Sequence, residues 1–149
     1  VALGIMRMGT LPVAGAVKTL QAAHEAGINF IDSADIYGRD PKLGRGSSEI
    51  HFGQALKQSG LRRDDFYIQS KAGLFADETG RITRYDSSKK HLLAAVDGIL
   101  KRMGIDYLDS FLIHRPDPLM DPEEVAEAFD ELQKAGKVLW RFQFQPATD

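Results

Sequence analysis

Cysteine is absent from the 149-residue sequence, which excludes disulfide bonds, thiolate metal sites and a cysteine nucleophile. Long apolar runs are absent too, and none approaches the roughly 20 residues that a membrane-spanning helix needs. Neither sign of charge is in excess, because 19 Lys and Arg stand against 21 Asp and Glu, a net charge of -2. We therefore expect no membrane partner and no nucleic-acid partner.

Several common functional motifs are also missing. There is no Gly-x-Gly-x-x-Gly and no Walker pattern, so the sequence offers no phosphate-binding glycine loop. The four histidines fall on different predicted elements without metal-ligand spacing, and we expect no metal site. No basic-then-apolar leader is present, which together with the lack of cysteine favours a cytoplasmic protein. The first residue is Val1 rather than Met, so we expect a fragment or a processed product.

Apolar runs alternate with helical periodicities along the chain. Strands are predicted over residues 2–6, 28–31, 66–68, 107–113 and 137–144. Helices are predicted over residues 13–26, 47–59, 89–103 and 122–135, with glycines just past their ends. Ser47, Ser48 and Glu49 are expected to cap the second helix, and Asp121 and Pro122 to begin the fourth. Residues 39–46 and 72–85 are expected to be loops.

The alternation of strands and helices with short connections predicts βαβ units and a parallel sheet. About five strands and four helices are too few for a closed eight-stranded barrel, which needs ~250 residues. The predicted fold class is therefore α/β, of the (β/α)8 TIM-barrel type, present as roughly its first half. We expect residues 1–149 to form one partial barrel domain. Nothing in the sequence sets an oligomeric state.

Ionisable side chains follow three of the predicted strands. Asp32 ends the second strand with Tyr37 just beyond it, Lys71 follows the third strand, and His114 follows the fourth. In a parallel barrel these ends lie at one rim, so the four side chains should lie close together. Three of the four also have a structural explanation when taken alone: Asp32 as a turn residue, Tyr37 as packing, His114 as a core histidine. Their joint occurrence favours a site.

The four residue types suit the protonation of a carbonyl oxygen. A tyrosine is a poor proton donor at neutral pH unless its surroundings help, and a nearby ammonium such as Lys71 is expected to lower the pKa of Tyr37. Asp32 would hold the lysine, and His114 would orient a substrate oxygen. Because no side chain supplies electrons, hydride must come from a cofactor.

Two neighbouring features carry less weight. Arg39, Lys42 and Arg45 cluster after Tyr37 and could attract an anionic ligand, but a solvated loop explains them better. Phe75, in the loop after Lys71, could line a substrate pocket or could equally serve in packing.

At this point the sequence resembles the aldo-keto reductases, which are NADPH-dependent (β/α)8-barrel enzymes, and especially a bacterial branch of oxidoreductases in that family. The matching motifs are GINFIDSADIYG at 27–38, SE at 48–49, GQAL at 53–56, SK at 70–71, LKRMGIDYLD at 100–109 and LIHRPD at 112–117. The likeness extends from about residue 1 to about residue 138. It implies a (β/α)8 barrel whose small-molecule substrate is an aldehyde or ketone, reduced reversibly to an alcohol with NADPH.

The resemblance also implies roles for individual positions. Tyr37 matches the general acid, Lys71 and Asp32 match the pair that tunes it, and His114 matches the residue that orients the substrate carbonyl. Asp32, Tyr37 and Lys71 also match positions beside the nicotinamide. Met8 and Gly9 fall where the loop after the first strand lines the cofactor pocket in family members.

Two departures qualify this resemblance. After Val138 the family usually continues to a strand end with Ser and Asn that bind the nicotinamide carboxamide, whereas here residues 139–146 lack that pair. A reading-frame disturbance or a fragment edge would explain the change, and an intact resequenced gene over codons 136 to 146 would exclude the former. The chain also stops where the family's remaining strands begin, and those carry most of the cofactor site.

The sequence therefore predicts an NADPH-dependent oxidoreductase fragment of the aldo-keto reductase type, with little activity alone. One alternative is a non-catalytic binding or regulatory module with a reductase-like fold. Another is an inactive truncated remnant.

Overall fold

Five parallel strands form the central sheet of the computed structural model, which describes residues 1–141. In the order in which they lie side by side, the strands are β1 (Ala2–Gly4), β2 (Phe30–Asp32), β5 (Tyr67–Ala72), β8 (Leu108–Ile113) and β9 (Val138–Arg141). Every neighbouring pair is parallel. The predicted parallel sheet is confirmed, and residues 142–144 of the predicted last strand lie outside the described residues.

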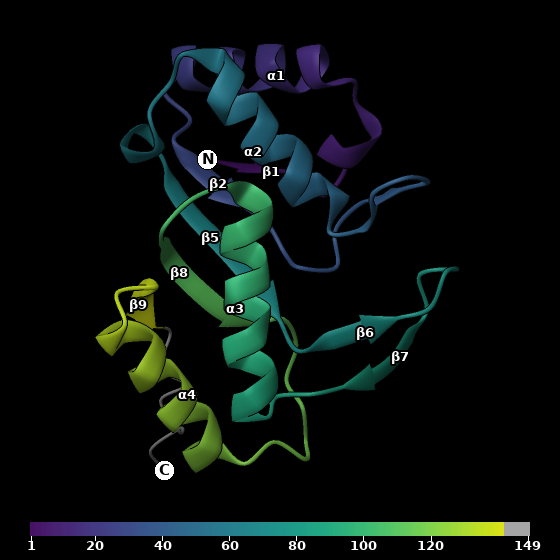
Figure 1. Cartoon of the computed structure of the whole chain (residues 1–149), viewed down its shortest axis with the longest axis vertical. Helices are drawn as coiled ribbons and strands as arrows, with labels where there is room; N and C mark the ends of the chain where they lie inside the picture. Colours follow the sequence, from purple (N-terminus) through teal and green to yellow (C-terminus); the bar gives the residue numbers. More distant parts are fainter. Residues whose placement is uncertain (142–149) are drawn as a thin grey trace.

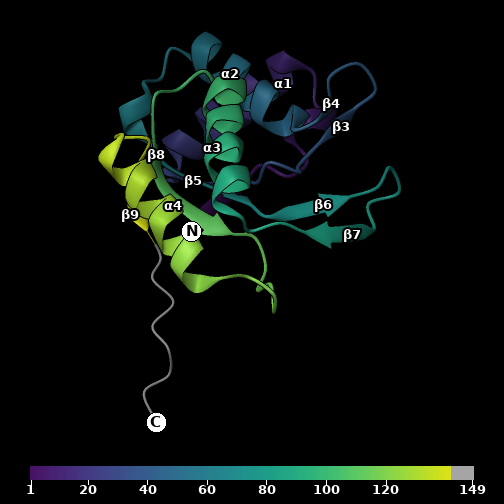
Figure 2. The same ribbon diagram turned by 60° about the horizontal axis from the view of Figure 1, so that its bottom comes forward.

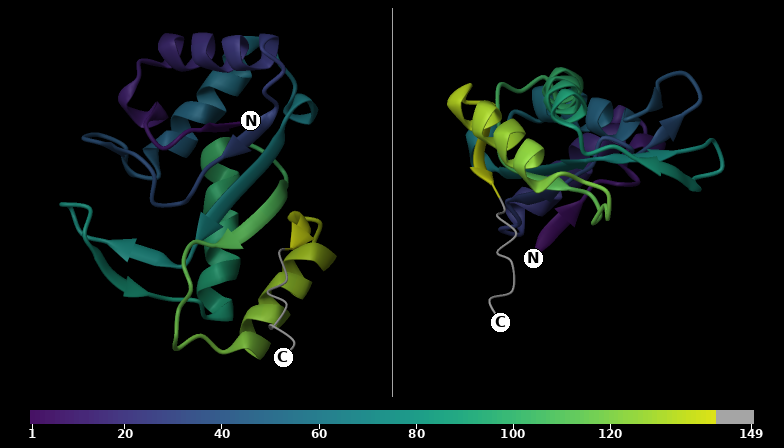
Figure 3. Two further views of the ribbon diagram at one scale, coloured as in Figure 1. Left: turned by 180° about the vertical axis from the view of Figure 1, so that it is seen from behind. Right: turned by 90° about the horizontal axis from the view of Figure 1, so that it is seen from below.

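The α-helices between these strands all lie on one side of the sheet (Figures 1 and 3). They are α1 (Val13–Glu25), α2 (Ser47–Ser59), α3 (Lys89–Met103) and α4 (Pro122–Lys134), with short 3-10 turns η1 (Met8–Thr10) and η2 (Arg63–Asp65). Strand order that follows chain order, with helices on a single side, is the arrangement of a (β/α)8 barrel. The chain forms roughly the first half of that fold.

The hydrophobic core fills the space between the sheet and the helices. The apolar face of α3 is buried in it, comprising Leu92, Val96, Ile99, Leu100 and Met103. From the sheet, Phe111 of β8 packs on Phe129 of α4 with ring centroids 5.4 Å apart. Because strand side chains alternate between faces, β5 buries Ile68, Ser70 and Ala72 and turns Gln69 and Lys71 to the face without helices.

The start of α4 agrees with the sequence, whereas the start of α2 differs from it. The Ser88 hydroxyl accepts the His91 N–H at the start of α3, and the Asp121 carboxylate accepts two N–H groups at the start of α4. The prediction that Ser47 and Ser48 cap α2 is wrong, because Gly46 occupies the N-cap and no side chain caps it. The two serines are buried and bond to other segments instead.

Two β-hairpins replace the predicted loops. The first, β3 (Arg39–Asp40) with β4 (Gly44–Arg45), follows β2, and the second, β6 (Leu74–Ala76) with β7 (Ile82–Tyr85), follows β5. Both reach outward on the same side of the molecule (Figure 2). The strands are only two to four residues long, so the period-2 signal of a half-buried strand is missing from the sequence. No helix within residues 1–141 is long and apolar enough to cross a membrane.

Candidate active site

A partly buried ion pair lies at the carboxyl ends of β2 and β5. Lys71 Nζ is 2.6 Å from Asp32 Oδ1 and donates a second bond of 2.6 Å to the Ser33 carbonyl. The amide of Gln69 donates to the same Asp32 oxygen at 2.8 Å. With a side-chain exposure of 12%, Lys71 needs these acceptors to offset its desolvation. Sheet pairing explains the encounter, because Asp32 is in register with Gln69, two residues before Lys71.

Tyr37 and His114 lie beside this pair. Their rings meet edge to face, with centroids 5.6 Å apart, and Lys71 Nζ lies 5.4 Å from the centroid of the Tyr37 ring. The His114 backbone N–H donates to the Ala72 carbonyl at 2.8 Å, which fixes the end of β8 against β5. The structure therefore brings together all four residues that the sequence singled out at the strand ends.

Burial raises the pKa of Tyr37, and the negative charge of Asp32 raises it further. The pKa of Tyr37 is therefore above its ordinary value, so Lys71 does not bring it below that value as expected. The reason is geometric: the Lys71 ammonium is bound directly to the Asp32 carboxylate, so its charge is largely compensated before it reaches the phenol. A phenol with a raised pKa stays protonated at neutral pH and is a hydrogen-bond donor.

Burial lowers the pKa of His114 to about 4, with the positive charges of Lys71 and Arg115 adding to the effect. The imidazole is thus neutral at physiological pH. Its Nδ1 atom is buried and has no hydrogen-bond partner within residues 1–141. A neutral ring with an unsatisfied nitrogen beside a protonated phenol forms a small polar site suited to an uncharged oxygen-containing ligand.

Behind the ion pair, a second carboxylate braces the two strand ends from the helix side. Glu49 is fully buried and accepts a hydrogen bond from Ser70 at 2.8 Å and a longer one from Ser33 at 3.4 Å. Its other oxygen accepts a bond of 2.7 Å from Arg102 of α3. Sequence reasoning treated Glu49 as a helix cap and missed this role. The alternation along β5 was the available signal, because it places Ser70 opposite the face of Lys71.

A third carboxylate, Asp35, precedes Tyr37 by two residues and was also missed. Its side chain is 8% exposed and lies 3.2 Å from the Arg45 guanidinium, which also donates to the Leu74 carbonyl at 2.8 Å. Burial raises the pKa of Asp35 to about 6, although Arg45 opposes this shift. Arg45 therefore links the segment before Tyr37 to the bases of both hairpins.

The two weaker cofactor candidates lie at η1. Met8 is buried in the hydrophobic core, and the N–H of Gly9 donates to the Ser48 hydroxyl at 3.2 Å. A side chain at position 9 would come within 2.9 Å of the Ser47 hydroxyl, so this glycine allows η1 to approach α2 closely. Among residues 1–141, no cluster of three His, Asp or Glu side chains could hold a metal ion.

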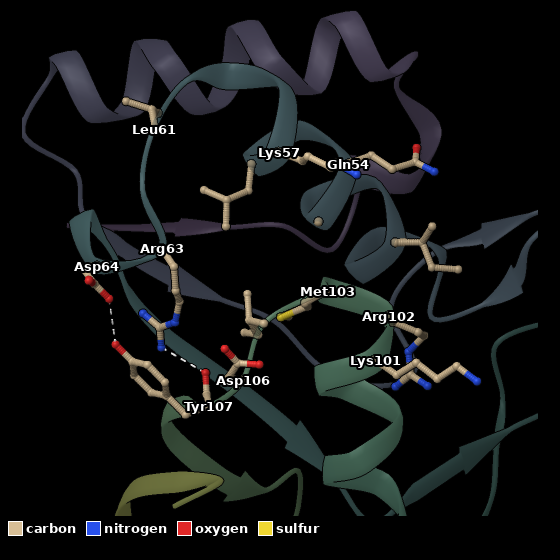
Figure 4. Close-up of a pocket in the computed structure, with 15 residues that line it drawn as sticks. Gln54, Lys57, Leu61, Arg63, Asp64, Lys101, Arg102, Met103, Asp106 and Tyr107 are labelled. Carbon is tan, nitrogen blue, oxygen red and sulfur yellow. Dashed lines mark hydrogen bonds between the residues drawn. The ribbon is translucent and has the colours of Figure 1, made fainter.

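A separate groove of about 760 Å³ lies between α2 and α3 (Figure 4). Lys57 of α2 and Lys101 of α3 line it, and the Tyr107 hydroxyl donates to Asp64 at 3.0 Å at its edge. Asp64 and Tyr107 stand just before β5 and β8, at the opposite end of the strands from Lys71 and His114. The groove is therefore not part of the candidate active site.

Residues 1–140 match the Aldo/keto reductase family. The chain belongs to this family. This aldo-keto reductase chain is 38% identical over 141 residues to the 6-dehydroglucose reductase of Novosphingobium aromaticivorans, covering 93% of the chain and 44% of that protein. It is 37% identical over 124 residues to the L-glyceraldehyde 3-phosphate reductase of Escherichia coli, covering 81% of the chain and 34% of that protein.

A solved aldo-keto reductase from Bacillus halodurans, in its holo form, superposes with a TM-score of 0.78 at 30% identity. The superposition covers 95% of this chain and 44% of that one. The aldo-keto reductase chain described here thus spans less than half the length of these relatives.

Proposed function

We propose that this chain is the proton-delivering part of a nicotinamide-dependent carbonyl reductase, with NADPH as the expected cofactor and an aldehyde or ketone as the substrate. The observation that carries the proposal is the meeting of Tyr37, His114 and the Asp32–Lys71 pair at one sheet edge. Residues 1–149 would then be one partial domain of the barrel.

The residues present fit a carbonyl ligand beside a reduced nicotinamide, because His114 Nδ1 is an unsatisfied buried atom next to a protonated phenol. When bound, the cofactor supplies a hydride to the carbonyl carbon. Tyr37 then gives its proton to the oxygen as negative charge builds on it, and the tyrosinate regains a proton from solvent. A neutral imidazole at His114 orients the oxygen without adding a charge.

Asp32 and Lys71 hold this arrangement in place. The Lys71 ammonium lies near the Tyr37 ring and offsets the Asp32 charge, which would otherwise oppose the tyrosinate that forms during turnover, while Asp32 fixes the ammonium. We assign both residues to the site on this ground. The names of two relatives indicate hydroxylated carbonyl substrates, one a sugar without a phosphate group and one a phosphorylated aldehyde.

The test joins residues 1–138 to the second half of the Novosphingobium aromaticivorans relative and follows NADPH oxidation with a small aldehyde. We expect turnover by this chimaera, loss of at least about a hundredfold in Tyr37→Phe, and no change in Tyr85→Phe, whose side chain is exposed on β7. The 149-residue chain alone should turn over little. Undiminished turnover in Tyr37→Phe would refute the assigned acid, whereas no turnover by the unsubstituted chimaera would favour a binding module.

A further inference from the structure

A pocket of about 520 Å³ lies between the two hairpins that follow β2 and β5. One hairpin contributes Arg39, Asp40, Pro41, Gly44 and Arg45, and the other contributes Ala76, Asp77 and Glu78. Ile36 completes the lining, and it directly precedes Tyr37. Consecutive Cα atoms are about 3.8 Å apart, so the wall of this pocket is one residue from the proposed acid.

Two arginines hold the walls of the pocket together. Arg39 of the first hairpin donates to the Glu78 carbonyl of the second. Arg45 donates to the Leu74 carbonyl at 2.8 Å and is anchored by Asp35 at 3.2 Å. Its guanidinium also lies 5.0 Å from the centre of the Phe75 ring. Both cationic groups are therefore engaged by protein acceptors, and the two hairpins are cross-linked across the pocket.

The remaining polar groups of the pocket are mostly carboxylates. Asp40 accepts the N–H groups of Lys42 and Leu43 through Oδ1, and these bonds lower its pKa. The Thr79 hydroxyl and N–H bond in the same way to Oδ1 of Asp77 and lower its pKa. Both groups are thus ionised at neutral pH, and each has a second oxygen outside these turn bonds.

The balance of charge in the lining is two arginines against the three acids Asp40, Asp77 and Glu78. Carboxylate oxygens are strong acceptors for the hydroxyl groups of a sugar. A phosphate would instead meet like charges, with both guanidinium groups already engaged. The pocket therefore matches a neutral ligand rich in hydroxyl groups and discriminates against a phosphorylated one.

We propose that the pocket between the hairpins binds the neutral polyhydroxyl end of a carbonyl substrate and rejects a phosphorylated end. This inference rests on the proposed function, because it extends the same site outward from Tyr37. It makes the two hairpins part of the substrate-binding site. Of the two kinds of substrate that the relatives' names indicate, it favours the one without a phosphate group.

The test is an NMR titration of the 15N-labelled 149-residue chain with D-glucose, D-glucose 6-phosphate and D-glucosamine at constant ionic strength. We expect saturable shifts with glucose at the amides of Gly44, Ala76 and Glu78, and at least about tenfold weaker binding of the phosphate. Equal or tighter binding of the phosphate, tighter binding of the cationic amine, or no shifts with glucose would each overturn the proposal.

Glu78→Gln removes one carboxylate and leaves the backbone carbonyl that Arg39 binds. We expect it to weaken glucose binding several-fold. The difference in affinity between D-glucose and D-glucose 6-phosphate should also become smaller. Glu127→Gln on α4 makes the same change in charge at an exposed site away from the pocket, and it should alter neither. Equal effects from both substitutions would contradict the assignment.

Binding and turnover are measured separately, so the two proposals fail separately. Glucose binding without turnover by the chimaera would reject the reductase and keep the pocket. Turnover without glucose binding would reject the pocket and keep the reductase.

Discussion

Glu49 accepts a hydrogen bond of 2.8 Å from Ser70 on the helix side of the sheet, one residue from Lys71 on the opposite side. The two strand ends that carry the candidate site are thus held by carboxylates on both faces. Asp32 acts on the face without helices, and the buried Glu49–Arg102 pair acts beneath it.

Arg102→Met should destabilise the fold by about 3–5 kcal/mol, because it leaves the Glu49 carboxylate buried without its cationic partner. Glu49 is 0% exposed, whereas Arg102 is 27% exposed and can turn to solvent. Glu49→Gln should therefore cost less, and adding it to Arg102→Met should recover part of the loss. Urea unfolding followed by circular dichroism gives the three values.

Lys137→Met is the matched control for this series. Its ammonium lies 2.6 Å from Asp97, but both side chains are well exposed, so the loss should stay below about 1 kcal/mol. If Lys137→Met and Arg102→Met lowered the free energy of unfolding by the same amount, burial of Glu49 would not be the source of the stabilisation.

The order of strands and helices could be predicted because each long element carries its own periodic signal. Helix α3 and the Asp121 cap of α4 are examples, and both lie where the sequence places them. The hairpins could not be predicted, since their strands of two to four residues are set by contacts such as Arg39 with the Glu78 carbonyl. The misassigned caps of α2 have the same origin, because Ser47 and Ser48 serve tertiary contacts rather than local ones.

Gly53→Ala should destabilise the chain by about 1–3 kcal/mol, although alanine favours helices in general. A Cβ at position 53 of α2 would lie 2.3 Å from the Met103 carbonyl oxygen, where α2 and α3 touch. Gly15→Ala in α1 is the control, because its Cβ would meet only ordinary contacts at 3.7 Å. The control should be neutral or stabilising by up to about 1 kcal/mol. Thermal unfolding of both variants measures the difference.

The candidate site could be predicted as a set of residues but not in its electrostatics. Strand ends at Asp32, Lys71 and His114 suffice to predict that the groups meet. The Asp32 carboxylate compensates the Lys71 ammonium because the two groups are 2.6 Å apart. The spacing of residues in the sequence does not encode that distance. For the same reason Asp35 was missed, because its partner Arg45 reaches it from a hairpin that the sequence does not predict.

Two buried groups should give stability opposite dependences on pH. The pKa of His114 falls from 6.5 to about 4 on folding, so its contribution is present above pH 6.5 and is lost as pH falls toward 4. The pKa of Asp35 rises from 3.8 to about 6, so its contribution is present below pH 3.8 and is lost as pH rises toward 6. Between pH 4 and 6 the two effects largely cancel.

Single substitutions should separate the two dependences of stability on pH. Asp35→Asn should leave stability rising with pH between 4 and 6, and His114→Gln should leave it falling, each by at most about 1.4 kcal/mol per pH unit. Urea midpoints at four pH values across this window provide the measurement. A proton NMR titration of the His114 ring should independently show a midpoint near 4. Parallel slopes in the two variants would reject the opposing assignment.

Asp32→Asn should lower the pKa of Tyr37, because the carboxylate is one of the two causes that raise it. Lys71→Met should have the reverse effect, since it leaves the Asp32 charge without its ammonium partner. Tyrosine labelled with 13C at Cζ allows each phenol to be titrated separately by NMR. Tyr107 is the internal control, because its pKa is raised by burial and by its bond to Asp64, far from Asp32. An unchanged Tyr37 midpoint in Asp32→Asn would mean that burial alone keeps this phenol protonated.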